Sequence, residues 1–195
     1  MTYNPAKHHR RSIRLKGYDY SRAGLYFITI CTQNRVCLFG KIENGVMELN
    51  DAGQMIKNEW LKLPERFQNI ELHEFIIMPN HFHAILEIVG ATLIVAPNVN
   101  DAPNVNNAAN GENGQPQGIA LTESATGKTV GEMVGAFESI TTVEYIRGVK
   151  NNNWQLFNKK MWQRNYREHI IRNEQLYVKI SEYIINNPAN WWNDS

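Results

Sequence analysis

The spacing of hydrophobic and polar positions predicts several strands along the chain. Residues 25–32 are dense in β-branched and aromatic side chains, which is typical of a strand. Residues 41–48 carry an Asn-Gly pair at their centre and predict a β-hairpin. Residues 70–78 and 81–88 predict two strands joined by a tight turn, and residues 162–171 predict a last strand.

Helices are predicted between and after these strands. One is capped by Asn50 and is stopped by Pro64. A second follows a Thr-x-x-Glu capping box and spans about residues 130–148, and a third spans about residues 174–187 behind an Asn cap. Strands and helices in this order predict an α+β fold, in which helices cover an antiparallel sheet.

One internal segment departs from this pattern. Residues 91–127 contain no Lys or Arg and are rich in Asn, Gly, Pro and Ala. Within them, residues 96–101 (APNVND) are followed by the near copy 102–107 (APNVNN). So polar a segment buries too little apolar surface to offset the entropy of ordering it. We expect a mobile, low-complexity surface insert within a single domain that covers residues 1–195.

The composition is that of a globular protein with a substantial core. Of the 195 residues, 43% are hydrophobic, and no apolar run approaches the roughly 20 residues that span a bilayer. The N-terminus has no apolar signal core, so we expect a cytoplasmic protein without a membrane partner. Cys31 and Cys37 have no neighbouring ligand set, which argues against a disulfide framework or a structural zinc site.

Charge is segregated along the chain, although the net charge is only +1. Residues 7–22 carry Lys and Arg against the single acid Asp19, and residues 147–172 do so against the single acid Glu168. Basic blocks of this kind suit a polyphosphate partner, because each phosphate contacted releases counterions. A solvated surface is the simpler explanation of such charge runs, and charge alone favours it over a polyphosphate partner.

Two histidines form the first candidate site. His81 and His83 alternate with Phe82 on a predicted strand, so we expect them to project from the open face of the sheet while Phe82 points to the core. Neutral imidazoles on a rigid strand can hold a divalent metal. Two surface histidines at this spacing also occur often by chance, and the pair taken alone favours that simpler explanation over a metal site.

A second candidate pair lies in the last helix. Tyr183 and Asn187 are four residues apart, which places a phenol and an amide on one helix face. Together they offer a nucleophile and a neutral oxygen ligand. From spacing alone, a half-buried core tyrosine and an ordinary helix C-terminus before Pro188 are the simpler explanations.

Four separated segments carry a more specific signal. They are residues 78–84 (MPNHFHA), 162–172 (WQRNYREHIIR), 182–188 (EYIINNP) and 11–20 (RSIRLKGYDY). Together they resemble the REP-associated tyrosine transposases, which belong to the HUH single-tyrosine transposases of small insertion sequences. The similarity extends over nearly the whole chain apart from the insert.

This resemblance implies a ferredoxin-like antiparallel β-sheet with helices packed on it, and it implies roles for particular residues. Tyr183 falls on the catalytic tyrosine, and His81, His83 and Asn187 fall on the metal ligands. The implied cofactor is a divalent metal, Mg²⁺ or Mn²⁺. Glu138 stands where relatives usually carry Lys, which puts one DNA contact in doubt.

The implied activity is that of a single-strand DNA endonuclease and strand-transferase that forms a 5′-phosphotyrosine. Its partner would be single-stranded DNA with hairpin or repeat ends, and the protein would be a monomer or a homodimer. The alternative is a catalytically silent DNA-binding derivative of the same fold. An unrelated His-based hydrolase and an RNA-binding sheet module fit the residues less well. The residues expected to contact DNA are Arg10, Arg11, Arg14, Lys16, Arg147, Lys150 and Arg164.

Overall fold

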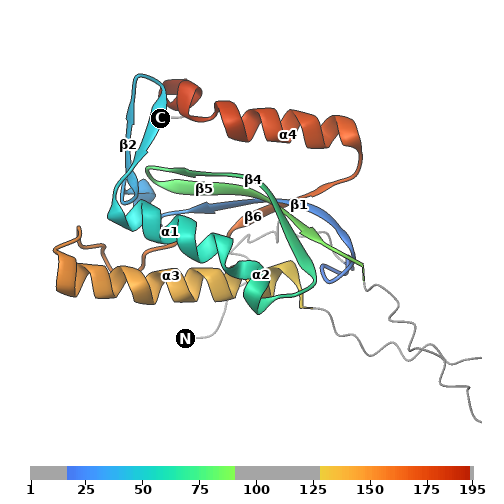
Figure 1. The fold of residues 1–195 in the computed structure, drawn as a ribbon, viewed down its shortest axis with the longest axis horizontal. Coiled ribbons are helices and arrows are strands. Elements are labelled where there is room, and N and C mark those ends of the chain that lie inside the picture. The colour runs from blue at the N-terminus through green and yellow to red at the C-terminus, as the bar shows by residue number, and fades with distance from the viewer. Residues whose placement is uncertain (1–16, 91–127, 194–195) are drawn as a thin grey trace, which may run out of the picture. The chain divides into compact units, whose positions relative to one another are not determined.

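A four-stranded antiparallel sheet forms the centre of the fold in the computed structural model, which describes residues 17–90 and 128–193 (Figure 1). The strand β1 (Gly24–Cys31) pairs with β5 (His81–Ile88) on one side and with β6 (Arg167–Ile171) on the other. The remaining strand, β4 (Ile70–Met78), pairs with the far side of β5. The strand order is therefore β4-β5-β1-β6.

The other elements are helices, short 3-10 turns and a hairpin. They are η1 (Gln33–Arg35), β2 (Gly40–Glu43), β3 (Val46–Leu49), α1 (Asp51–Leu61), α2 (Leu63–Arg66), α3 (Val130–Asn152), α4 (Glu174–Asn186) and η2 (Pro188–Asn193). Asn50 and Asn173 cap α1 and α4, because their side chains accept backbone N–H groups of the first turn. The predicted caps of these helices are thus confirmed.

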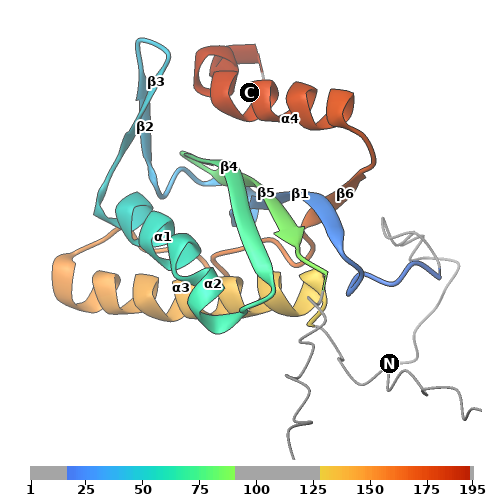
Figure 2. The ribbon, with the colours of Figure 1, turned by 45° about the vertical axis from the view of Figure 1, so that its right-hand side comes forward.

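Alternation along the strands gives the sheet two different faces. One face carries Tyr26, Ile28 and Phe82, which are fully buried against the layer of α1 and α3. We call this the α3 face. The opposite face carries Phe27 and Ile85, packs against α4, and is called the α4 face. Figures 1 and 2 show α4 on one side of the sheet and the other helices on the opposite side.

The α+β fold class predicted from the sequence is confirmed, with two local corrections. Pro64 does not stop a helix, because it lies in the first turn of α2, where a missing N–H leaves no hydrogen bond unmade. The last strand begins at Arg167 and not at residue 162, since Trp162 turns inward and donates its indole N–H to Thr141. Of the predicted strand's first half, only an isolated bridge between Thr32 and Trp162 remains.

Two parts of the sequence prediction lie outside the described residues. These are the insert at residues 91–127 and the basic segment that holds Arg10, Arg11, Arg14 and Lys16. Within residues 17–90 and 128–193, no helix combines the length and the apolar character needed to cross a membrane.

Two glycines of α3 test its packing. A methyl group at Gly148 would overlap the indole ring of Trp154, whereas one at Gly135 would meet nothing within 4 Å. We therefore expect Gly148→Ala to lower the free energy of unfolding by roughly 1–3 kcal/mol. The control Gly135→Ala should leave it unchanged or raise it by up to about 1 kcal/mol, because alanine favours helix. Urea denaturation measures both, and equal effects would show that Trp154 does not pack on Gly148.

Candidate functional site

His81 and His83 lie on the α4 face, side by side on β5. Their ring centroids are 4.6 Å apart. We expected this face of the sheet to be open, and that expectation is wrong, since the two residues are only 3% and 5% exposed. The reason is that α4 and η2 cover this face, so that Tyr183 and Trp191 contact the two imidazole rings. The pair is therefore a buried site and not a surface one.

Each nitrogen of His83 has a neighbour on a different element. Its Nδ1 lies 2.9 Å from Thr29 Oγ1 on β1, and its Nε2 lies 3.4 Å from the phenol oxygen of Tyr183 on α4. The Phe27 ring stacks on His83 with centroids 5.4 Å apart. These contacts fix the imidazole plane and place the predicted nucleophile directly beside the predicted metal ligand.

His81 is oriented by a chain of hydrogen bonds. Asn80 donates its amide N–H to the carbonyl of Arg35, so its Oδ1 acts as an acceptor. The Nδ1 of His81 lies 2.8 Å from that oxygen and is therefore the donor. A carbonyl or amide oxygen holding Nδ1–H is the usual support of a histidine that coordinates a metal through Nε2.

The electrostatics of the site favour neutral imidazole. Burial, together with the nearby charges of His81 and Arg35, lowers the pKa of His83 to about 3. His83 is therefore uncharged at neutral pH. An uncharged imidazole is the form that binds a divalent metal.

Asn187 contributes an unusual observation. It is 1% exposed, and neither polar atom of its side chain has a hydrogen-bond partner among the described residues. A buried amide left unpaired is destabilising unless something else satisfies it. Along the chain, Asn187 lies between Tyr183 and Trp191, the residues that contact the two histidines. Its unpaired oxygen therefore fits a metal ligand, and the donor set of two imidazoles and one amide fits a divalent ion.

Next to the histidines a cleft of about 480 Å³ opens to solvent. Tyr183 lines it and is 44% exposed, so its hydroxyl can be reached from outside. Arg35 and Arg167 also line the cleft. Neither arginine was among the site residues predicted from the sequence. Arg167 stands in a basic block, but Arg35 lies in η1, and only the folded chain brings that turn to β5.

One known protein is similar to this chain over almost its whole length. No known protein-family profile matches the chain. An uncharacterized protein of Haemophilus influenzae is 42% identical over 192 residues, which are 98% of this chain and 95% of the relative. The chain belongs to the family of that H. influenzae protein.

Among solved structures, the fold is similar to that of a REP-associated tyrosine transposase bound to a REP hairpin. The TM-score is 0.55 and the sequence identity is 16%, over 91% of this chain and 73% of that one. At this identity the likeness concerns the fold alone. It shows that this chain has a transposase-like α+β fold.

The described residues predicted to contact DNA are spread over the molecule. Arg147 and Lys150 are exposed on α3, the helix layer across the sheet from the histidines, and Arg147 pairs with Glu144. Arg164 is exposed in the segment before β6. Their role in binding stays a prediction.

Glu138 lies in α3 and does not line the cleft. Burial raises its pKa to about 7, and one of its carboxylate oxygens has no hydrogen-bond partner within the described part of the chain. A carboxylate in this setting is held in the helix layer and is not a solvated surface charge.

Asn187 also allows a stability test. In protein treated with a chelator, Asn187→Leu should raise the melting temperature by roughly 2–4 °C for each kcal/mol of removed desolvation penalty. The neighbouring Asn186→Leu is the control, because that side chain is exposed on α4 and should change the melting temperature little. A lower melting temperature for Asn187→Leu would mean that the amide is hydrogen-bonded in solution and has a structural role.

Proposed function

We propose that this protein is a metal-dependent tyrosine transposase that cleaves single-stranded DNA and transfers the strand. The observation that carries the proposal is the 3.4 Å separation between the Tyr183 hydroxyl and His83 Nε2 at the edge of a solvent-open cleft. A catalytic phenol together with a metal-binding histidine pair is what the resemblance to the REP-associated tyrosine transposases predicts. The transposase-like fold is consistent with it.

The metal would be held by His81, His83 and Asn187, and the buried, unpaired amide of Asn187 is the feature that favours this set. A bound Mg²⁺ or Mn²⁺ would polarise a non-bridging phosphate oxygen and offset the negative charge that develops on it. Thr29 and Asn80 would keep the two imidazoles in the required orientation through their contacts with the Nδ1 atoms.

Tyr183 supplies the nucleophile. Its phenol oxygen bonds to phosphorus while the bond between phosphorus and the leaving 3′ oxygen breaks. The phenol proton is lost to water in the cleft, and the leaving oxygen takes up a proton to become a 3′-OH. Because the phosphodiester becomes a 5′-phosphotyrosine and is not hydrolysed, the strand can later be joined to another 3′-OH.

Arg35 and Arg167 would contact the DNA backbone beside the scissile phosphate. Both line the cleft with Tyr183, and Arg167 is exposed on β6. Guanidinium groups bind phosphate through two parallel N–H donors, which fixes position as well as charge. Single-stranded DNA with a hairpin or repeat end is the partner that we propose.

The second candidate is a catalytically silent DNA-binding derivative of the same fold. Glu138 favours it, because an acid with a pKa raised to about 7 stands where the resemblance leads us to expect a lysine. The complete set of His81, His83, Tyr183 and Asn187 favours the active enzyme.

Removing the Tyr183 hydroxyl distinguishes the active transposase from the silent DNA-binding derivative. Tyr183→Phe should abolish the covalent protein–DNA adduct with labelled single-stranded DNA and Mn²⁺, while binding stays within about twofold, because only the nucleophilic oxygen is lost. Tyr166→Phe is the matched control, since its hydroxyl donates to Glu168 and not to the histidines. Denaturing gels measure the adduct. If the adduct persists in Tyr183→Phe and is lost in Tyr166→Phe, then Tyr166 is the nucleophile.

The two arginines of the cleft should act through phosphate contacts. Arg35→Gln and Arg167→Gln should each weaken binding of all single-stranded sequences and flatten the log–log salt dependence by roughly 0.7 per lost contact. Lys57→Gln is the control, because Lys57 lies on α1, across the sheet from the cleft (Figure 1), and is not among the residues expected to contact DNA. Fluorescence anisotropy over a salt series checks this, and equal slopes for the parent and both cleft variants would contradict it.

A further inference from the structure

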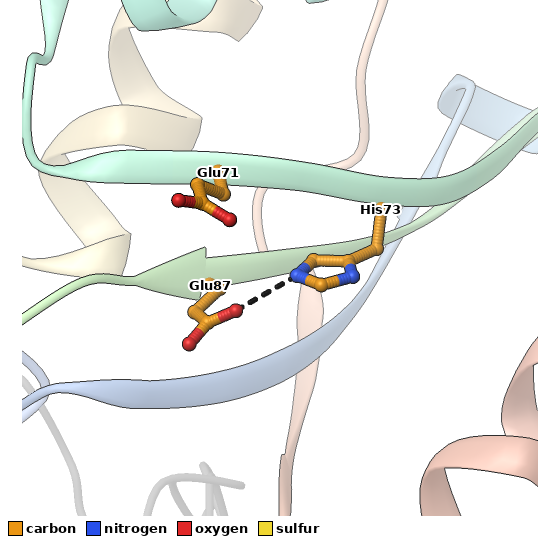
Figure 3. Close-up of side chains that lie close together, drawn as sticks. All are labelled: Glu71, His73 and Glu87. Carbon is orange, nitrogen blue, oxygen red and sulfur yellow. Dashed lines mark hydrogen bonds and ion pairs between the residues drawn. The ribbon is translucent and has the colours of Figure 1, made fainter.

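A second cluster of metal-type ligands lies on the α4 face, at the other end of β5 from the histidine pair. Glu71 and His73 come from β4 and Glu87 comes from β5, and their side chains point toward one another (Figure 3). One ligand atom from each of the three lies within 4.8 Å of the others. His73 Nε2 and Glu87 Oε2 are 2.9 Å apart.

An irregularity in β4 creates this cluster. Leu72 pairs with Leu86 and Phe75 with Ala84, so His73 and Glu74 together stand opposite a single residue of β5. Such a β-bulge changes the direction of side chains locally. Here both His73 and Glu74 reach Tyr177 on α4.

The hydrogen bonds around Tyr177 fix the proton on His73. Glu74 Oε2 accepts the Tyr177 hydroxyl at 2.9 Å and the Ser181 hydroxyl at 3.1 Å. A phenol has only one proton to donate, so the Tyr177 oxygen acts as acceptor toward His73 Nδ1, 3.2 Å away. His73 therefore carries a proton on Nδ1, and its Nε2 is the atom that faces Glu87.

Nε2 faces a carboxylate oxygen, so either a proton on Nε2 or a cation bound by both atoms holds the two together. Glu71 is the direct cross-strand partner of Glu87, and like charges in that position are destabilising. A proton on Nε2 would leave a net charge of −1 on the three residues. A divalent ion would instead neutralise the negative charges of both carboxylates, those of Glu71 and Glu87. Two ligands of a tetrahedral metal, each about 2.1 Å from it, lie roughly 3.4 Å apart, so the observed 2.9 Å would have to widen by about 0.5 Å when the metal binds.

We propose that Glu71, His73 and Glu87 bind a divalent transition-metal ion of the zinc type. Tyr177 is a positioning residue that holds the His73 ring through Nδ1 and ties it to α4. The site is separate from the His81 and His83 pair, and its existence does not depend on the proposed function. One imidazole nitrogen and two carboxylates are ligands that suit Zn²⁺.

Zinc binding by the full chain tests the proposal directly. After chelator treatment, titration calorimetry with ZnCl₂ should find one fewer equivalent bound by Glu87→Gln than by the parent protein. His73→Gln should lose the same equivalent, which guards against a folding defect in either variant. The difference of one equivalent is expected whether or not the catalytic histidines also bind Zn²⁺, so the two proposals succeed or fail separately.

Two further variants sharpen the result. Glu48→Gln, on β3 outside the cluster, should bind as many equivalents as the parent. Tyr177→Phe should keep the site but weaken its zinc affinity by roughly 10–100-fold, as loss of a ligand's supporting hydrogen bond typically does. If Glu87→Gln and His73→Gln bind as much zinc as the parent, the cluster is an imidazolium–glutamate ion pair and the proposal is wrong.

Discussion

The alternation of side chains along β5 is the constraint on which the site depends. Phe82 is fully buried on the α3 face and packs against Trp60 and Phe137. Because successive residues point to opposite faces, His81 and His83 must then point to the α4 face. A shift of one residue in register would send both histidines into an apolar core, where a paired imidazole site would be costly. The burial of Phe82 in the core thus determines the face of the sheet to which the two histidines point.

Helix α4 makes polar contacts with the sheet near both of its own ends. Tyr177 and Ser181 donate to Glu74 of β4, and Tyr183 meets His83 of β5. On the same helix, Ile180 and Ile184 form an apolar cluster with Ile85 and Ile171 of the sheet. The apolar contacts hold the helix on the sheet, while the polar contacts at either end set its position along the strands. The placement of Tyr183 therefore depends on residues well away from the cleft.

Much of the fold could be predicted from the sequence, because local signals were strong. The bounds of β4 and β5 follow from their apolar runs and the Pro-Asn turn between them, and Asn50 and Asn173 cap the helices as expected. The start of β6 could not be predicted, because tryptophan is common both in strands and in buried loop positions. What places Trp162 is its hydrogen bond to Thr141 of α3, which is a tertiary contact.

The residues of the candidate site could be named from the sequence, but their burial and their neighbours could not. The sequence pattern and the family resemblance name His81, His83 and Tyr183, which the structure brings together. Neither could reveal that α4 and η2 bury the histidines, or that η1 brings Arg35 to the cleft. Those facts depend on how distant segments pack, and periodicity along the chain carries no information about that.

The central claim is that Tyr183 becomes covalently linked to DNA. The most direct measurement is mass spectrometry of the protein after incubation with single-stranded DNA from the flanks of its own gene and Mn²⁺ or Mg²⁺. Our account predicts a nucleotide joined through a 5′-phosphate to the peptide that contains Tyr183. A metal-loaded, folded protein that binds this DNA and carries no nucleotide on Tyr183 would contradict it.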